Sequence, residues 1–131
     1  TIIGENVAFY LQGELALINF TDNTTVSLSG AASGVMAGLL FFEDRSTSTG
    51  RLHKIKSANA HTLTGTIYLP NGKLRVDPNT SVAQNSAYTA IISYQVEIDE
   101  GPTLVLNDNY SDTNVPVPEG IRTSSQVVLG Q

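Results

Sequence analysis

Hydrophobic and polar residues alternate along much of this chain. Such alternation is typical of β-strands with one buried face. In the clearest segments, two large aliphatic residues stand on either side of a single residue. These segments are residues 15–17, 26–28, 74–76, 96–98 and 104–106. No stretch of a dozen residues keeps apolar groups at helical spacing without interruption by Gly, Asn or β-branched residues. The pattern therefore predicts an all-β fold.

The chain also contains a degenerate internal repeat. Residues 36–42, 63–69 and 88–94 superpose at spacings of 27 and 25 residues, and residues 9–11 precede 40–42 by 31. Each copy is followed by further short alternating segments. Three short strands per repeat, with a period in the twenties, are typical of a β-solenoid. We therefore predict a short right-handed parallel β-helix of about four coils, with an antiparallel β-sandwich as the alternative.

Stacked coils would place equivalent side chains in columns, because residues two apart on a strand share a face. The first predicted buried column contains Phe9, Leu40, Ile67 and Ile92. The second contains Leu11, Phe42, Leu69 and Tyr94. The residues predicted to point outward between them are Tyr10, Phe41, Tyr68 and Ser93.

The length of 131 residues fits a single folding unit. We assign residues 1–118 to the β-solenoid domain and residues 119–131 to a C-terminal tail or cap that follows Pro116 and Pro118. The longest apolar run, residues 35–42, is far shorter than the roughly 20 residues that span a bilayer. The sequence begins at Thr1 without a basic or apolar leader. An export signal or membrane anchor is therefore expected upstream.

Composition and charge narrow the function classes. Thr, Ser and Asn make up 36 of the 131 residues, which suits strands and turns. Cysteine is absent, which excludes disulfides, thiolate metal sites and cysteine nucleophiles. The net charge of −5 argues against nucleic acid and anionic lipid as partners.

Several segments, in order along the chain, resemble one bacterial family. Residues 33–45, Ser-Gly-Val-Met-Ala-Gly-Leu-Leu-Phe-Phe-Glu-Asp-Arg, resemble the C-terminal domain of the TadE/TadG-like proteins of Flp pilus assembly. The likeness continues at residues 63–72, Leu-Thr-Gly-Thr-Ile-Tyr-Leu-Pro-Asn-Gly, and at residues 87–92 and 104–111. Residues 6–11 match as well, so the resemblance covers about residues 6–118.

This resemblance implies an extracytoplasmic bacterial domain, in the periplasm or at the cell surface. The family carries it behind an N-terminal membrane helix, in a system that builds type IVb (Flp, Tad) pili. We therefore expect a non-catalytic structural or interaction domain for pilus assembly or cell-surface adhesion. Its partners would be proteins of that system, or further copies that associate through the solenoid edges. The alternative, by fold analogy, is a β-helix protein that binds or degrades polysaccharide.

The charged residues offer little catalytic or metal-binding chemistry. Glu43 and Asp44 are adjacent and would point to opposite faces of a strand, so a surface turn closed by an Asp44–Arg45 pair is favoured over a catalytic pair. The two histidines lack metal-binding spacing. The acidic residues that fit a charged strand edge better than a calcium loop are Glu97, Asp99, Glu100, Asp108 and Asp112. We predict no catalytic, cofactor or metal site, and no enzymatic activity.

Two groups of residues are candidates for an interaction surface. Four of the seven Lys and Arg lie within residues 45–56, and such a cluster suits an acidic partner or an anionic glycan, or is an ordinary solvent face. The basic group is Arg45, Arg51, His53, Lys54 and Lys56. The aromatic group is Tyr10, Phe41 and Tyr68, which would bind sugar rings or a partner, or lie beneath a terminal segment.

Overall fold

The computed structural model describes residues 1–77, 80–99 and 103–118, and these residues form an all-β fold as predicted. The strands are β1 (Ile2–Gly4), β2 (Phe9–Leu11), β3 (Asn19–Phe20), β4 (Thr25–Ser29), β5 (Leu39–Glu43), β6 (Arg51–Ile55), β7 (Asn59–Val76) and β8 (Thr89–Ile98). One short 3-10 helix, η1, covers Tyr110–Asp112. No helix in the described part of the chain is long and apolar enough to cross a membrane.

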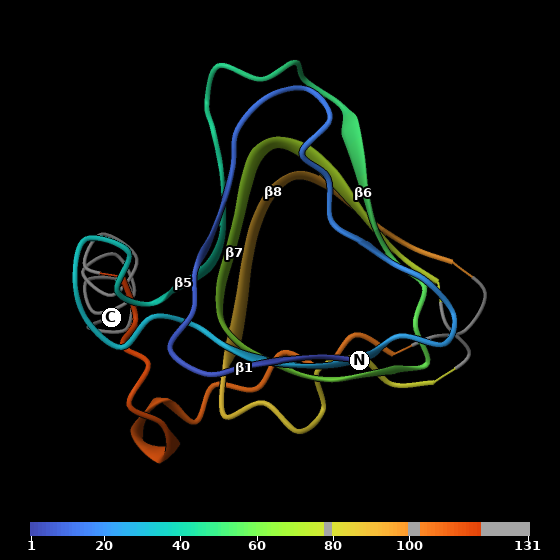
Figure 1. The fold of residues 1–131 in the computed structure, drawn as a ribbon. Helices are drawn as coiled ribbons and strands as arrows, with labels where there is room; N and C mark the ends of the chain where they lie inside the picture. The colour runs from blue at the N-terminus through green and yellow to red at the C-terminus, as the bar shows by residue number, and fades with distance from the viewer. Residues whose placement is uncertain (78–79, 100–102, 119–131) are drawn as a thin grey trace, which may run out of the picture.

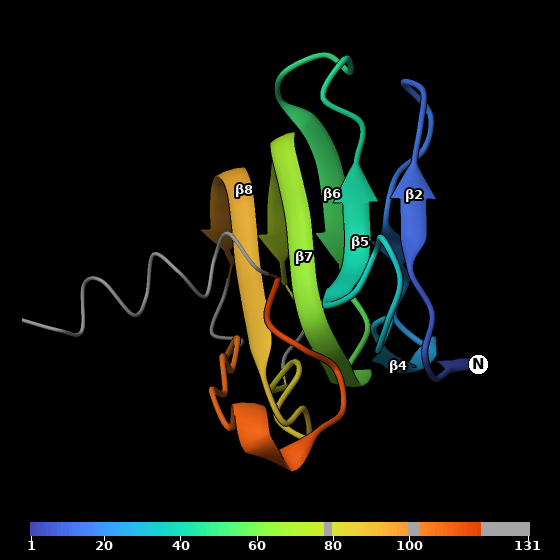
Figure 2. The same cartoon turned by 90° about the vertical axis from the view of Figure 1, so that its left-hand side faces the viewer.

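The sheet curls because its central strand is long and bent. β7 runs for 18 residues and pairs successively with β4, β5 and β6 on one side. On its other side it pairs with β8. Figure 1 shows the chain following three sides of a triangle, with β8 behind β7. In Figure 2, β2, β5, β7 and β8 stand side by side.

Every named strand pair among the described residues is parallel. Phe9 pairs with Phe41, Phe41 with Ile67, and Ile67 with Ile91. On the next side of the triangle, Phe20 pairs with Ile55 and continues the same pattern. These pairings exclude the antiparallel β-sandwich for the strands described.

The predicted columns are wrong by one residue in β5 and β8. Phe41 and Ile91, rather than Leu40 and Ile92, lie beside Ile67. The register shifts between Leu39 and Phe41, so Leu40 and Phe41 are both buried. Two consecutive apolar residues fit either register in a sequence superposition, and a shift of one residue reverses the face of each side chain.

The second buried column is corrected in the same way. Leu11 pairs with Glu43, and Leu69 pairs with Ser93. Phe42 lies beside Tyr10 and Tyr68, on the outer face.

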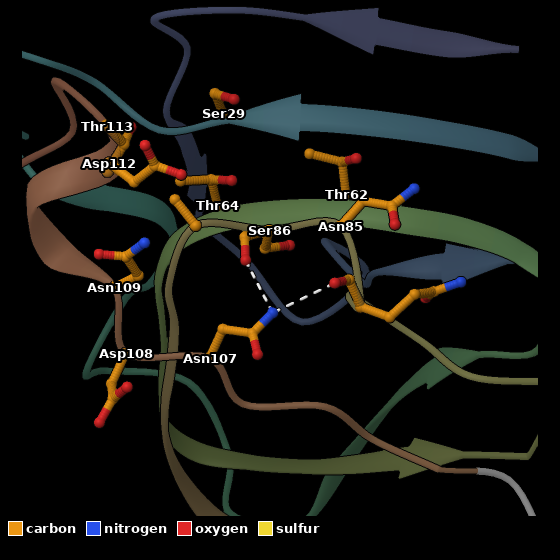
Figure 3. Close-up of a pocket in the computed structure, with 12 residues that line it drawn as sticks. Ser29, Thr62, Thr64, Asn85, Ser86, Asn107, Asp108, Asn109, Asp112 and Thr113 are labelled. Atoms are coloured by element: carbon orange, nitrogen blue, oxygen red, sulfur yellow. Dashed lines mark hydrogen bonds between the residues drawn. The ribbon is translucent and has the colours of Figure 1, made fainter.

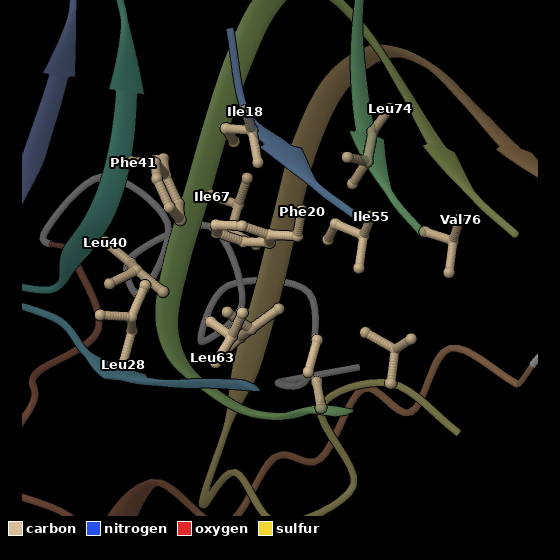
Figure 4. Close-up of a cluster of buried hydrophobic side chains, with 14 of the residues drawn as sticks. Ile18, Phe20, Leu28, Leu40, Phe41, Ile55, Leu63, Ile67, Leu74 and Val76 are labelled. Atoms are coloured by element: carbon tan, nitrogen blue, oxygen red, sulfur yellow. The ribbon is translucent and has the colours of Figure 1, made fainter. Parts of the chain in front are cut away.

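Hydrophobic side chains fill the interior (Figure 4). They come from successive passes of the chain and stack on one another. Aliphatic residues of β7 form its centre, because alternate positions of that strand point inward. The β7 residues that are at most 1% exposed include Ala60, Leu63, Ile67, Leu69, Leu74 and Val76. Because these side chains are closely packed, shortening one of them leaves a cavity.

The described C-terminal segment packs back against a corner of the fold. Gly38 adopts a positive φ of 86°, and a Cβ there would collide with the carbonyl oxygen of Pro116. The Tyr88 hydroxyl donates to that same oxygen at 2.5 Å. Residues up to Pro118 therefore belong to the packed unit, whereas the predicted tail or cap at residues 119–131 lies outside the described residues.

The observed register predicts unequal effects for two isoleucines that the sequence superposition placed in one column. Ile67→Ala should lower the free energy of unfolding by about 2–5 kcal/mol, because Ile67 is buried. Ile92→Ala should cost less than about 1 kcal/mol, because Ile92 lies on the outer face and is 38% exposed. Urea unfolding of both variants measures the difference, and equal losses would contradict the register.

Candidate functional site

Glu43 is the centre of a buried polar cluster on the inner side of β5 and β6. Its Oε2 accepts hydrogen bonds from Arg51 Nη2 at 2.7 Å and from His53 Nε2 at 2.8 Å. Its Oε1 accepts from the backbone N–H of Asn71 at 2.9 Å. Gly72 leaves the space for this cluster, since a Cβ there would lie 2.6 Å from His53 Cδ2. We call Glu43, Arg51 and His53 the buried triad.

Arg51 connects the buried triad to the first pass of the chain. Its Nη1 donates to the carbonyl oxygens of Gly13 and Glu14 at 2.9 Å each and to that of Ala16 at 3.3 Å. All three acceptors are backbone groups of one loop, which the guanidinium therefore holds against β6. The geometry gives Arg51 a structural role rather than a place in an exposed site.

His53 is held as a neutral imidazole. The backbone N–H of Ile18 donates to His53 Nδ1 at 3.1 Å, so Nδ1 carries no proton and the Nε2 proton faces Glu43. Burial lowers the pKa of His53 from its ordinary 6.5, although the hydrogen bond and charge of Glu43 oppose the shift.

The predicted basic surface is therefore divided by the fold. Arg51 and His53 point inward, with side chains 7% and 0% exposed, so their expected place on a docking surface is wrong. Lys54 is half-buried and Lys56 is exposed. The reason is strand alternation, which places Arg51, His53 and Ile55 on the inner face. The surface turn expected at Glu43 is also wrong, because the Glu43 side chain is buried.

Three aromatic rings form an outer column across β2, β5 and β7. The ring centroids of Tyr10 and Phe42 are 5.6 Å apart, and those of Phe42 and Tyr68 are 5.2 Å apart. The Arg45 guanidinium lies 5.7 Å from the centroid of Tyr68. We call Tyr10, Phe42 and Tyr68 the outer aromatic column.

The outer aromatic column contains Phe42 in the place predicted for Phe41. Phe41 is 5% exposed and stacks on Phe9 with ring centroids 5.0 Å apart, so its expected outward position is wrong. An apolar cleft of about 250 Å³ beside Phe42 is bordered by Ile92 and Pro118.

Asp44 is half-buried, and it is hydrogen-bonded to Tyr10 of the outer aromatic column instead of paired with Arg45. It accepts a hydrogen bond from the Tyr10 hydroxyl at 2.5 Å and from the backbone N–H of Ser46 at 2.8 Å. The Tyr10 hydrogen bond is the main cause that lowers the pKa of Asp44 to about 2, and it raises the pKa of Tyr10.

A polar groove of about 530 Å³ opens near the C-terminal end of the described chain. Neutral Ser, Thr, Asn and Gln supply nine of its twelve lining residues, with Asp108 and Asp112 at one side. Figure 3 shows Asn107 within it, whose Nδ2 donates to the carbonyl oxygens of Gln84 at 3.2 Å and Ser86 at 2.8 Å. These groups are able to hydrogen-bond a polar ligand.

The two edges of the sheet are the remaining candidate surface. Among the described residues, β1, β2 and β3 each pair with one strand, and so does β8. We call β1–β3 the N-terminal edge and β8 the C-terminal edge. An apolar cavity of about 240 Å³ opens at the N-terminal edge. Glu97 lies on the C-terminal edge, in ion pairs with Arg75 at 3.2 Å and Lys73 at 3.6 Å; Glu100 is outside the described residues.

The acidic residues are not gathered into a metal-binding group. Across residues 1–77, 80–99 and 103–118, no group of three or more His, Asp or Glu side chains is placed to hold a metal ion. Glu97 and Asp99 instead pair with Arg75.

Comparison of the chain with protein-family models, with curated proteins and with solved structures finds no match in any of the three.

Sequence reasoning missed the buried triad, and it expected a charged strand edge around Glu97 where β8 also exposes Val96 and Ile98. Alternation from Arg51 through His53 to Ile55 was the available signal for the triad, since a buried Ile55 implies that the other two share its face. The role of Glu43 depends on the backbone of Asn71, which lies 28 residues further along the chain. Local pattern does not show a contact of that kind.

The neutral state of His53 predicts a loss of stability in mild acid. Between the ordinary pKa of 6.5 and the lower folded-state pKa, the unfolded chain binds a proton that the folded chain does not. The free energy of unfolding should therefore fall as the pH drops from 7.5 to 5.5, by at most about 1.4 kcal/mol per pH unit from this group. Urea unfolding at several pH values measures it.

His61→Asn is the control and should retain this pH dependence, whereas His53→Asn should reduce it. If His53→Asn does not fold, titration of the wild-type histidine resonances by NMR decides the matter. A His53 resonance that titrates above pH 6.5 would contradict the prediction.

The Tyr10–Asp44 hydrogen bond predicts a measurable change in carboxyl titration. In Tyr10→Phe, the pKa of Asp44 should rise from about 2 toward its ordinary 3.8 because the main cause of the shift is removed. Carboxyl-detected NMR titration measures it. Tyr68→Phe is the matched control and should leave the Asp44 titration unchanged; an equal rise in both variants would show that the hydroxyl of Tyr10 is not responsible.

Proposed function

We propose that the curled parallel sheet is a short right-handed β-helix of about four coils that serves as a non-catalytic structural and interaction domain. It acts in an extracytoplasmic bacterial protein, in Flp pilus assembly or cell-surface adhesion. The columns of parallel partners that run through β2, β5, β7 and β8 support the coil assignment. The observation that supports an interaction role is that, within the described part of the chain, β7 is the one named strand that pairs with β8.

β8 has the properties of a strand that accepts another strand. It is ten residues long, and Glu97 is its only charged residue. It contains neither Lys nor Pro, the residues that commonly protect an exposed edge. Val96 and Ile98 are 43% and 52% exposed, although their partners on β7 are fully buried. A domain with such an edge is suited to binding another protein chain.

The buried triad supports a non-catalytic role. The Glu43 carboxylate is enclosed by hydrogen bonds from Arg51, His53 and Asn71, so it is not presented to a substrate. The resemblance of residues 6–118 to TadG-like proteins supports the envelope location and a pilus-assembly partner.

A polysaccharide-binding or polysaccharide-degrading role is the second candidate, and the polar groove favours the binding form. Its neutral hydroxyl and amide groups match the hydrogen-bonding groups of a glycan. The outer aromatic column is less suited to sugar stacking, since Phe42 is packed between Tyr10 and Tyr68 and its ring faces are partly covered.

The proposed role predicts that a charge on β8 abolishes the cellular function while the domain still folds. Val96→Lys should leave a cooperative unfolding transition but strongly reduce pilus number and adhesion in the bacterium that encodes the chain, because a lysine there opposes strand docking. Electron microscopy of cells carrying the variant and a surface-adhesion assay measure the two outcomes.

Val35→Lys provides the control, since Val35 is fully exposed and lies away from the C-terminal edge. It should retain normal pili and adhesion. Normal pili and adhesion in Val96→Lys cells that contain normal amounts of the protein would refute the proposed role.

A further inference from the structure

At the C-terminal edge, the residues that the structure describes leave part of the apolar interior uncovered. Inward positions of β7 continue into β8 at Ile91, Val96 and Ile98, which pair with Ile67, Leu74 and Val76. The three β7 residues are at most 1% exposed, whereas Val96 and Ile98 are 43% and 52% exposed. Completing their burial requires another layer of inward apolar side chains.

The N-terminal edge exposes the same interior at the opposite end of the stack. Phe9 is 38% exposed and Leu17 is 42% exposed, beside the more buried Ile18 and Phe20. These four side chains line the cavity of about 240 Å³. The cavity is open at the point where a preceding layer would lie.

We propose that the C-terminal edge of one copy of this chain docks on the N-terminal edge of a second copy in parallel register. This inference rests on the proposed function, and it names the partner of the C-terminal edge. Continuing the pairing by one layer on two sides of the triangle brings β8 of one copy against β2 and β3 of the next. On these two sides, successive layers within the chain already use that arrangement. On the third side, residues 103–109 already stack on residues 82–88, so β1 of the next copy has to move away from them.

The columns continue across the junction with matching side chains. Phe9, Phe41, Ile67 and Ile91 form one column, so Ile91 of one copy meets Phe9 of the next. A second column contains Phe20, Ile55, Val76 and Ile98. In that column Ile98 meets Phe20. Both junctions are apolar, as are the corresponding contacts within one chain.

The charges along the outer face are compatible with the same register. One outer column contains Asn19, Lys54, Arg75 and Glu97. Stacking places Glu97 against Asn19 of the next copy, with Lys54 one layer beyond. The carboxylate therefore meets an amide and then a cation, so the junction between the two copies places no like charges against each other in this column.

Such a contact is heterologous, because two different surfaces meet. Each docking event leaves a free edge at either end, so association continues and produces open-ended stacks. A contact between two C-terminal edges would instead close as a dimer. The two arrangements differ in which variants remain able to associate.

Sedimentation velocity of the chain over a wide concentration range tests the proposal. The wild-type chain should form dimers and larger species as concentration rises. Val96→Lys blocks the C-terminal edge and Leu17→Lys blocks the N-terminal edge, and each should raise the dissociation constant at least about tenfold. A mixture of these two variants should form a dimer and nothing larger, because each supplies one intact edge.

Leu15→Lys is the control for Leu17→Lys, since Leu15 is 93% exposed and is absent from the N-terminal cavity lining. It should associate like the wild-type chain. Circular dichroism and thermal melting establish that each variant folds, and Ile98→Lys replaces Val96→Lys if the latter does not.

Three results would overturn the stacking proposal. The first is a wild-type chain that stays monomeric at all concentrations. The second is a Leu17→Lys variant that dimerises as well as the wild type, which indicates a contact between C-terminal edges. The third is a chain that associates only when it is truncated after Pro118. That result would mean that residues 119–131, rather than a second copy, occupy the edge. If the wild type is monomeric but Val96→Lys still abolishes pili and adhesion, the proposed function stands and a different protein occupies β8.

Discussion

Parallel stacking is the constraint on which the rest of this structure depends. When one pass of the chain lies directly on the previous pass, each inward position must hold a side chain that packs against the same position above and below it. The column of Phe9, Phe41, Ile67 and Ile91 meets this requirement with aromatic and aliphatic groups. The bend of β7 lets a single strand contribute to three sides of the interior. The buried side chains of these columns together form one continuous hydrophobic core.

The buried triad shows how the same constraint accommodates charge. Glu43 occupies an inward position beside Leu11, where a carboxylate without partners would be very costly. Arg51 and His53 reach it from β6, and the backbone of Asn71 adds a third donor. The absence of a Cβ at Gly72 makes room for the imidazole. Ionic and neutral partners together satisfy the carboxylate, and Arg51 also holds the loop of the first pass in place.

A stack of layers has two ends, and the apolar side chains exposed at those ends connect the fold to its proposed role. Inward apolar residues continue up to β8 at one end and β2 at the other. The described residues do not bury them. The inward apolar columns that fill the middle of the stack therefore also leave apolar side chains exposed at its edges. The polar groove and the outer aromatic column lie on the sides of the stack, where they do not contribute to the interior.

The sequence by itself determined the all-β class, the repeat and the approximate position of most strands, because alternation and turn residues are local properties. Residues 15–17 and 104–106 alternate as clearly but form no named strand. It also placed Tyr10 and Tyr68 on the outer face. Tertiary structure alone decided the register, since in Leu40-Phe41-Phe42 and Ile91-Ile92 either apolar residue fits an inward position until a bulge or a neighbouring strand selects one. It likewise decided that Arg51 and His53 are buried, because their partner Glu43 and the space beside Gly72 come from different passes of the chain. Local pattern limits which face a residue occupies, but contacts between distant segments determine what it meets there.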